Sequence, residues 1–137
     1  MGLPAGQSAR TVEFWSRLDV DPDGDAQGFG YGTESPGRGF YVFPAHPPTR
    51  TLTFSRFDVD GACNTTSLLG DCQVKTGVDL RDGRWHHIAT TYDSTTVRMF
   101  VDATLVGERA QLLDTGTSGG ACIGGRCSIS QQAFQLG

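Results

Sequence analysis

Residues 82–93 read DGRWHHIATTYD, and residues 97–102 read VRMFVD after a short polar connection. The Asp-Gly pair at residues 82–83 is a turn signal, and the β-branched and aromatic residues after it favour a strand. A third apolar run, at residues 105–106, follows a second short turn. Three short strands joined by tight turns predict an antiparallel meander.

The first strand of this meander carries bulky residues on both of its faces. Alternation places Trp85 and His87 on one face and Tyr92 on the other. Apolar bulk on both faces is expected in a sandwich with one side covered and the other partly covered. Core packing is the common fate of strand aromatics. The residues that we therefore predict in the structural core are Trp15, Trp85, His87 and Tyr92.

Three stretches of the chain resemble a known family. The meander is similar to the central hairpin of laminin-G-like jelly-roll domains in the concanavalin A-like lectin and glucanase superfamily, which typically begins Asp-Gly-x-Trp-His-His. Residues 10–15, RTVEFW, resemble the family's Thr-(Val/Ile)-Glu-x-Trp strand, and residues 122–125, CIGG, resemble its late Tyr-Ile-Gly-Gly segment. The resemblance covers most of the chain in the expected order. It implies an all-β fold, an antiparallel β-sandwich of the jelly-roll (concanavalin A-like) type.

The composition favours the same fold class. The chain has 19 glycines and 6 prolines among 137 residues, and no stretch sustains a helical period for three turns. At this length we expect residues 1–137 to form a single domain with a sizeable core. The resembling family usually adds a strand before residue 10 and another after the Ile-Gly-Gly segment. Residues 1–9 and 126–137 offer little for these terminal strands, so completion of the sheet by a neighbouring chain or by self-assembly stays open.

Further apolar runs predict strands outside the meander at residues 11–18, 28–32, 39–43, 51–57 and 121–123. The run at residues 39–43 should end at Pro44, because proline cannot donate a hydrogen bond to a sheet ladder. Residues 58–75 are expected to form a long excursion that holds the first pair of cysteines.

The net charge of the chain limits the classes of partner that it is expected to bind. A net charge of −4 argues against nucleic acid and anionic membranes. No run of apolar residues is long enough to cross a bilayer, so membrane insertion is not expected.

Four cysteines fall in two local pairs, Cys63 with Cys72 and Cys122 with Cys127. Zinc sites usually place paired cysteines about two to four residues apart, and the first pair here is too widely spaced. Two local disulfides that close loops fit better and imply a secreted protein, in the extracellular space or at the cell surface. The alternative of four reduced, buried cysteines in a cytosolic protein stays open.

An acidic run before Gly30 resembles part of a calcium loop. Asp19, Asp21, Asp23 and Asp25 place a carboxylate at every second position, as in the first half of an EF-hand loop. The twelfth position is Gly30 instead of a bidentate glutamate, so the EF-hand rule fails. A solvated turn is the favoured alternative, although calcium is a recurrent ligand in the resembling family. Calcium is therefore the one cofactor that the sequence suggests.

Catalysis is not indicated by the histidine pair at residues 86–87. Consecutive rings in a strand point to opposite faces, so these two cannot share a metal ion or relay a proton. No serine stands in a Gly-x-Ser-x-Gly context. Glycosidases need two paired acids, and the Glu-x-Asp-x-x-Glu pattern of the resembling hydrolases is missing. We expect no enzyme, with a glucanase-type hydrolase as the least favoured alternative.

Two features suit the surface of an extracellular protein. Asn64 begins an Asn-Thr-Thr glycosylation sequon, which matters in a eukaryotic source. Tyr31, Tyr41 and Trp15, where exposed, could stack on sugar rings. We expect a non-catalytic recognition or adhesion module that binds glycan or protein surfaces. The competing class is a structural building block of a larger extracellular assembly or filament.

Overall fold

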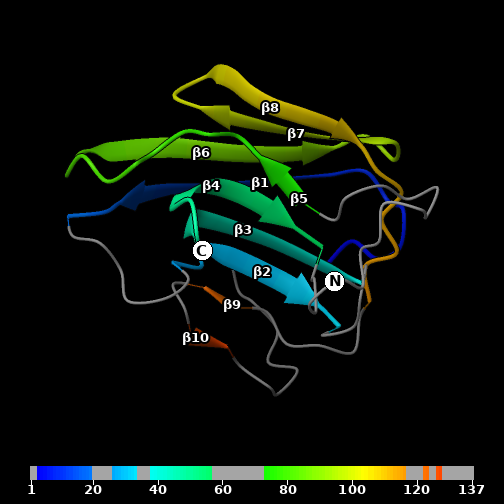
Figure 1. Cartoon of the computed structure of the whole chain (residues 1–137). Helices are drawn as coiled ribbons and strands as arrows, with labels where there is room; N and C mark the ends of the chain where they lie inside the picture. The colour runs from blue at the N-terminus through cyan, green and yellow to red at the C-terminus, as the bar shows by residue number, and fades with distance from the viewer. Residues whose placement is uncertain are drawn as a thin grey trace.

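Two antiparallel sheets lie face to face in the computed structural model, which describes residues 3–19, 26–33, 38–56 and 73–116 and the backbone of residues 122–123 and 126–127 (Figure 1). One sheet has four strands in the order β1-β6-β7-β8, and the other has six in the order β10-β9-β2-β3-β4-β5. The described residues contain no helix that could span a membrane. This architecture confirms the predicted all-β fold, an antiparallel β-sandwich of the jelly-roll type. The strands are β1 (Arg10–Arg17), β2 (Phe29–Gly32), β3 (Gly39–His46), β4 (Thr51–Ser55), β5 (Gln73–Lys75), β6 (Trp85–Tyr92), β7 (Thr96–Val101), β8 (Thr104–Ala110), β9 (Cys122–Ile123) and β10 (Arg126–Cys127).

The predicted meander forms three neighbouring strands of the four-stranded sheet. Strand β6 pairs with β7, and β7 pairs with β8. Asp93 closes the first turn, because its Oδ1 accepts hydrogen bonds from the backbone N–H groups of Thr95 and Thr96. Strand β1 pairs with the other edge of β6 along its whole length.

Two predicted boundaries in the six-stranded sheet were wrong: the end of the strand that begins at residue 39, and the end of the excursion at residue 75. Strand β3 continues through Pro44 to His46, because the β3–β4 register shifts between Phe43 and His46, and a proline is tolerated at such an irregularity. Strand β5 falls inside the excursion predicted at residues 58–75 and pairs with β4. Three residues are too few to give a readable alternation in the sequence.

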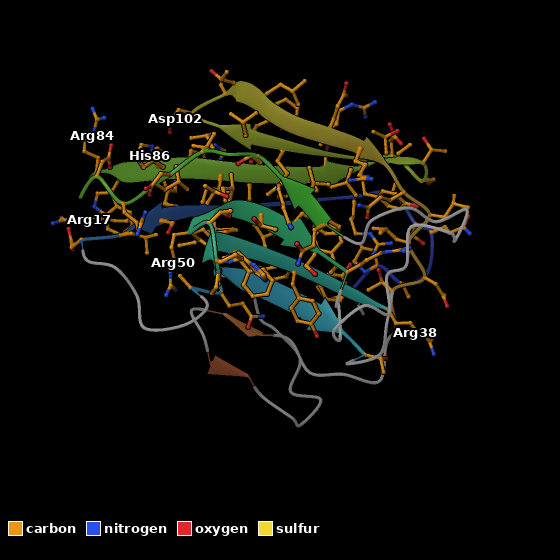
Figure 2. All side chains as sticks on the ribbon, in the orientation of Figure 1. Arg17, Arg38, Arg50, Arg84, His86 and Asp102 are labelled. Atoms are coloured by element: carbon orange, nitrogen blue, oxygen red, sulfur yellow. The ribbon has the colours of Figure 1, made fainter. Side chains whose placement is uncertain are left out.

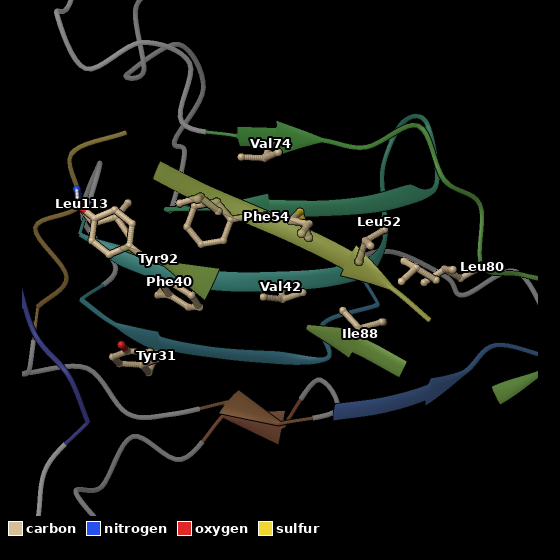
Figure 3. Close-up of a cluster of buried hydrophobic side chains, with 13 residues drawn as sticks. Tyr31, Phe40, Val42, Leu52, Phe54, Val74, Leu80, Ile88, Tyr92 and Leu113 are labelled. Carbon is tan, nitrogen blue, oxygen red and sulfur yellow. Dashed lines mark hydrogen bonds between the residues drawn. The ribbon is translucent and has the colours of Figure 1, made fainter. Parts of the chain in front are cut away.

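The hydrophobic core lies between the two sheets (Figure 3). Tyr92 is 2% exposed, as predicted, and its hydroxyl accepts a hydrogen bond from the backbone N–H of Leu113 at 3.1 Å. The other core residues alternate along strands of both sheets, which is the pattern of a sandwich interior. The core cluster comprises Tyr31, Phe40, Val42, Leu52, Phe54, Val74, Leu80, Ile88, Tyr92, Val97, Met99, Val101 and Leu113.

Arg10 places a cation at one end of this core, where it is 7% exposed. Its guanidinium donates hydrogen bonds to the backbone carbonyls of Ser8, Pro4 and Gly6, at 2.8, 3.0 and 2.8 Å. A fourth bond, of 2.7 Å, goes to the Tyr31 hydroxyl. These four acceptors satisfy most of the five N–H groups of the guanidinium.

Three aromatic rings surround the same guanidinium. The Arg10 carbon Cζ lies 6.0, 5.5 and 5.4 Å from the ring centroids of Tyr31, Phe40 and Tyr92. At these distances the ring faces attract a cation, and more strongly when water is excluded. Burial raises the pKa of the Tyr31 phenol, so this group stays neutral, accepts from Arg10 and donates to the Pro4 carbonyl.

Replacement of Arg10 should destabilise the domain. Arg10→Met retains most of the volume but removes the four hydrogen bonds of the buried guanidinium and its contacts with three aromatic rings, so we expect the free energy of unfolding to fall by roughly 3 kcal/mol. Arg17→Met, at the exposed end of the same strand, is the matched control and should stay close to wild type. Chemical denaturation measures both changes, and equal stabilities of the two variants would contradict this role of Arg10.

Candidate functional site

Two tryptophans lie exposed on the outer face of the four-stranded sheet. Trp15 on β1 is 63% exposed and Trp85 on β6 is 60% exposed. The prediction that both belong to the structural core was therefore wrong. The β1–β6 register pairs Trp15 with His87 and Trp85 with Arg17, and these residues alternate with the core-facing ones on each strand.

His87 was also predicted in the core, and this prediction was wrong as well. Its side chain is 30% exposed and lies on the outer face beside Trp15. The ring centroids of Trp15 and His87 are 5.2 Å apart, and the rings are tilted by 50°. His87 Nε2 also lies 3.5 Å from a carboxylate oxygen of Glu13. The opposite face of β6 supplies the core with Ile88 and Tyr92.

The exposed apolar surface extends across the four strands of this sheet. Trp15 and Trp85 are diagonal neighbours on β1 and β6, which places their Cα atoms about 7–8 Å apart. On the same face, Phe100 of β7 pairs with Ala89 of β6 and with Leu105 of β8, which is 47% exposed. We call this surface the tryptophan platform; it consists of Trp15, Trp85, His87, Phe100 and Leu105.

Charged groups at one end of the platform bind one another in pairs. Arg17 Nε donates to Asp19 Oδ1 at 2.7 Å, and Arg84 Nε donates to Asp82 Oδ2 at 2.8 Å. Each of these cations therefore has a carboxylate partner beside the tryptophans. The end of the platform carries charged groups without a large excess of either sign.

His86 lies at the same end, near Arg84 and Asp102 (Figure 2). Its Nδ1 is 2.8 Å from Asp102 Oδ2, and its Nε2 is 3.0 Å from Asp82 Oδ1. The hydrogen bonds to Asp102 and then to Asp82 raise the pKa of His86. The backbone N–H of Arg84, followed by His86, holds the pKa of Asp82 well below its usual range. His86, followed by the backbone N–H of His87, lowers the pKa of Asp102.

This cluster was not predicted from the sequence. Asp82 and Asp102 were expected only as turn residues, and the spacing between them does not show that they meet. The two consecutive histidine rings do point to different surroundings, as alternation predicts, because His86 contacts Asp82 and Asp102 whereas His87 contacts Trp15 and Glu13.

The calcium loop predicted at Asp19, Asp21, Asp23 and Asp25 lies mostly outside the described residues. Of the four, the structure describes Asp19, whose Oδ1 accepts from Arg17. Within the described part of the chain, no group of three or more His, Cys, Asp or Glu residues has a geometry that could hold a metal ion. Calcium binding therefore stays a prediction.

The other predicted site residues also lie partly outside and partly inside the described part of the chain. Cys63, Cys72 and Asn64 lie outside the described residues. Tyr31 and Tyr41 are 4% and 7% exposed, so their rings are not available for sugar stacking. The backbone of Cys122 on β9 lies directly opposite that of Cys127 on β10.

The exposure of the tryptophans leads to a stability prediction. Trp15→Ala and Trp85→Ala should each lower the free energy of unfolding by less than about 1 kcal/mol, because surface substitutions remove little packing. Tyr92→Ala, a buried aromatic of the same sheet, should lower it by about 3–5 kcal/mol. Thermal or chemical denaturation of the three variants checks this ranking, which fails when either tryptophan variant unfolds as easily as Tyr92→Ala.

The strand register leads to a prediction about the second cysteine pair. Directly opposed residues of an antiparallel pair have Cα atoms about 4.5–5.5 Å apart, within the range of disulfides. We expect a non-reduced digest to contain one peptide pair joined through Cys122 and Cys127. Reaction of both thiols with an alkylating reagent before reduction, or pairing of either with Cys63 or Cys72, would contradict the local disulfides.

Comparison with solved structures shows the same fold elsewhere. Domain 4 of AbnA, a GH43 extracellular arabinanase from Geobacillus stearothermophilus solved in complex with arabinotriose, superposes with a TM-score of 0.60 at 16% sequence identity. The match covers 85% of this chain and 50% of that one, so this chain corresponds to about half of the arabinanase domain structure. Comparison with curated protein sequences found no match.

The sequence itself identifies the family. The profile of the concanavalin A-like lectin/glucanase superfamily (Laminin_G_3) matches residues 3–135, which is nearly the whole chain. The two antiparallel sheets and the meander beginning at the Asp-Gly turn agree with this match. The chain therefore belongs to the concanavalin A-like lectin/glucanase superfamily.

Proposed function

We propose that the chain is a non-catalytic glycan-recognition module and that the tryptophan platform binds the sugar. The observation that carries the proposal is the exposure of two tryptophans, 63% and 60%, on one face of a sheet. Contiguous exposed apolar surface marks interaction sites, and amphipathic rings suit surfaces that are both apolar and wet. The C–H-rich face of a sugar ring can stack on such an indole while its hydroxyl groups bond to polar neighbours.

The charges around the platform favour a neutral sugar. Arg17 and Arg84 each bind a carboxylate, so among the residues that the structure describes, the platform end has no unopposed cluster of cations that would select an acidic glycan. Their remaining N–H groups, together with Glu13, supply donors and acceptors for hydroxyl groups. A neutral oligosaccharide is therefore the ligand class that we propose.

The structural neighbour suggests the first ligand to test. Domain 4 of the arabinanase was solved with arabinotriose, a neutral trisaccharide, and arabino-oligosaccharides are therefore the starting point for this chain. We propose binding without hydrolysis. Of the carboxylates that the structure describes near the tryptophans, Asp19 binds Arg17, whereas Asp82 and Asp102 are engaged by His86 and by backbone N–H groups. Glu13 lies 3.5 Å from His87 Nε2 on the platform. The predicted disulfides favour an extracellular location for this function.

A structural role in a larger assembly is the second candidate. Among the described strands, β1 and β8 form the two edges of the four-stranded sheet. Edge strands can pair with a strand of another chain. Sedimentation of the protein separates the candidates, because strand addition between copies gives a concentration-dependent oligomer whereas a recognition module can stay monomeric.

The glycan proposal leads to a binding prediction. In calorimetric titrations, arabinotriose or another neutral oligosaccharide should bind the wild type, and Trp15→Ala and Trp85→Ala should each weaken binding at least about tenfold, equivalent to ~1.4 kcal/mol. Leu112→Ala is the matched control, because Leu112 is 47% exposed outside the platform.

The titrations should be run with and without calcium, because the predicted calcium loop is a separate source of binding. Loss of sugar binding on calcium removal, with no effect of the tryptophan variants, would place the site at the loop. The absence of binding across a panel of neutral glycans, or equal binding by wild type and both tryptophan variants, would contradict the proposal.

A further inference from the structure

We infer that His86 is a positioning residue for the tryptophan platform and that its protonation makes ligand binding stronger in mildly acidic than in mildly alkaline solution. The inference rests on the proposed function, because it concerns the same platform. The contacts of the His86 ring with Asp82 and Asp102 carry the inference. These two carboxylates also bind the backbone N–H groups of residues before and after Trp85.

Each carboxylate binds both the imidazole ring and a backbone N–H group of strand β6 or of the residue before it. Asp82 Oδ1 accepts from the backbone N–H of Arg84 at 2.9 Å and lies 3.0 Å from His86 Nε2. Asp102 Oδ1 accepts from the backbone N–H of His87 at 2.9 Å, and its Oδ2 lies 2.8 Å from His86 Nδ1. Trp85 is therefore between two anchored backbone positions, and the His86 ring joins the two anchors.

The same contacts join two turns that are distant in the sequence. Asp82 belongs to the turn before β6, and Asp102 belongs to the turn between β7 and β8. The Asp102 backbone N–H also donates to the His87 carbonyl at 2.9 Å. Trp85 is the first residue of β6. The start of this strand is thus fixed by the side chains of Asp82 and Asp102, one from each turn.

Both ring contacts require a charged imidazole. Imidazolium donates from Nδ1 and Nε2, whereas neutral imidazole donates from one nitrogen and presents a lone pair at the other. A lone pair facing a carboxylate oxygen repels it, so deprotonation of His86 breaks one of the two contacts. The ring itself is largely shielded from water, because the His86 side chain is 14% exposed.

The groups that face His86 determine the direction of the pH effect. Asp102 and Asp82 bind its ring, Arg84 shares the Asp82 carboxylate, and Ser16 is its uncharged neighbour on β1. His87 points to the opposite face and acts on Asp102 through its backbone N–H. The charged neighbours in direct contact with the ring are therefore both anionic, and they favour imidazolium.

The sign of the pH dependence follows from these contacts. The pKa of His86 is raised above its usual value of 6.5, so the stabilisation is fully present below pH 6.5 and is lost as the pH rises through the folded-state pKa. The pKa values of Asp82 and Asp102 are lowered, so both carboxylates stay charged throughout this range. The contacts of His86 with Asp82 and Asp102 are consequently intact below pH 6.5 and are lost as the pH rises through the folded-state pKa of His86.

The first test needs no ligand. The chain has two tryptophans, so nitrogen-15 spectra contain two indole N–H signals, which Trp15→Phe assigns. The Trp85 indole should become more mobile, by heteronuclear NOE, as the pH rises through the titration midpoint of the His86 ring. In His86→Gln, which cannot titrate, and in Asp102→Asn, which removes one anionic partner, this transition should disappear. A Trp85 indole with the same mobility on both sides of the His86 midpoint would overturn the inference.

The second test uses arabinotriose as the probe at pH 5.5 and pH 8.5. Binding by the wild type should be about fivefold weaker at the higher pH, a coupling at the lower end of the usual range, and His86→Gln should remove the difference. Asp79→Asn is the matched control, because it breaks an Asp–Arg pair of the same kind, Asp79 with Arg81, without contacting His86; it should keep the pH dependence. Equal affinity at the two pH values would overturn the inference. No binding at either pH would contradict the proposed function for this sugar, and the indole measurement then decides the inference by itself.

Discussion

The buried guanidinium of Arg10 sets the geometry on which the rest of the structure depends. It draws the carbonyls of residues 4–8 over one end of the core, and Gly6 there pairs with Thr115 through two backbone hydrogen bonds. Because Arg10 faces inward and opposes Tyr92, strand alternation fixes the register of β1 on β6. A slip of one residue would exchange the two faces of the strand. The outward position of Trp15, five residues later, is therefore a consequence of where Arg10 lies.

Much of the fold could be predicted from the sequence because alternation and turn residues are local signals. The meander and the strand at residues 11–18 were confirmed for this reason. Alternation separates the two faces of β6 but does not say which face the second sheet covers, and this is why Trp85 was predicted in the core while Tyr92 was correctly placed there. Arg10 gave no signal at all, since a charged residue at a strand end is ordinarily solvated.

The cluster around His86 could not be predicted because Asp82 and Asp102 each make a local hydrogen bond to the backbone as well as a contact with the His86 ring. Aspartates at turns are expected from their hydrogen bonds to nearby backbone N–H groups, and Asp82 and Asp102 make such bonds. Their additional contacts, with the His86 ring, depend on two turns that meet at one end of the sheet. That meeting is set by the pairing of β6 with β7, which brings residue 102 beside residue 87. Tertiary pairing therefore turns ordinary turn residues into a charged cluster beside the platform.

The two outer faces of the sandwich differ in what they offer a ligand. On the six-stranded sheet, Tyr41 and Phe43 stack at 6.2 Å, but Tyr41 is 7% exposed and its ring lies over Gly30, where a side chain would collide with it. The Tyr41 ring therefore packs against the protein itself and is closed to a ligand. On the four-stranded sheet, the indoles of Trp15 and Trp85 rise from paired strands and stay open to solvent. Paired strands fix the backbone before a ligand arrives, and tryptophan has few rotatable bonds to order. The platform therefore combines exposure with rigidity, and both properties favour the binding of the neutral sugar that we propose.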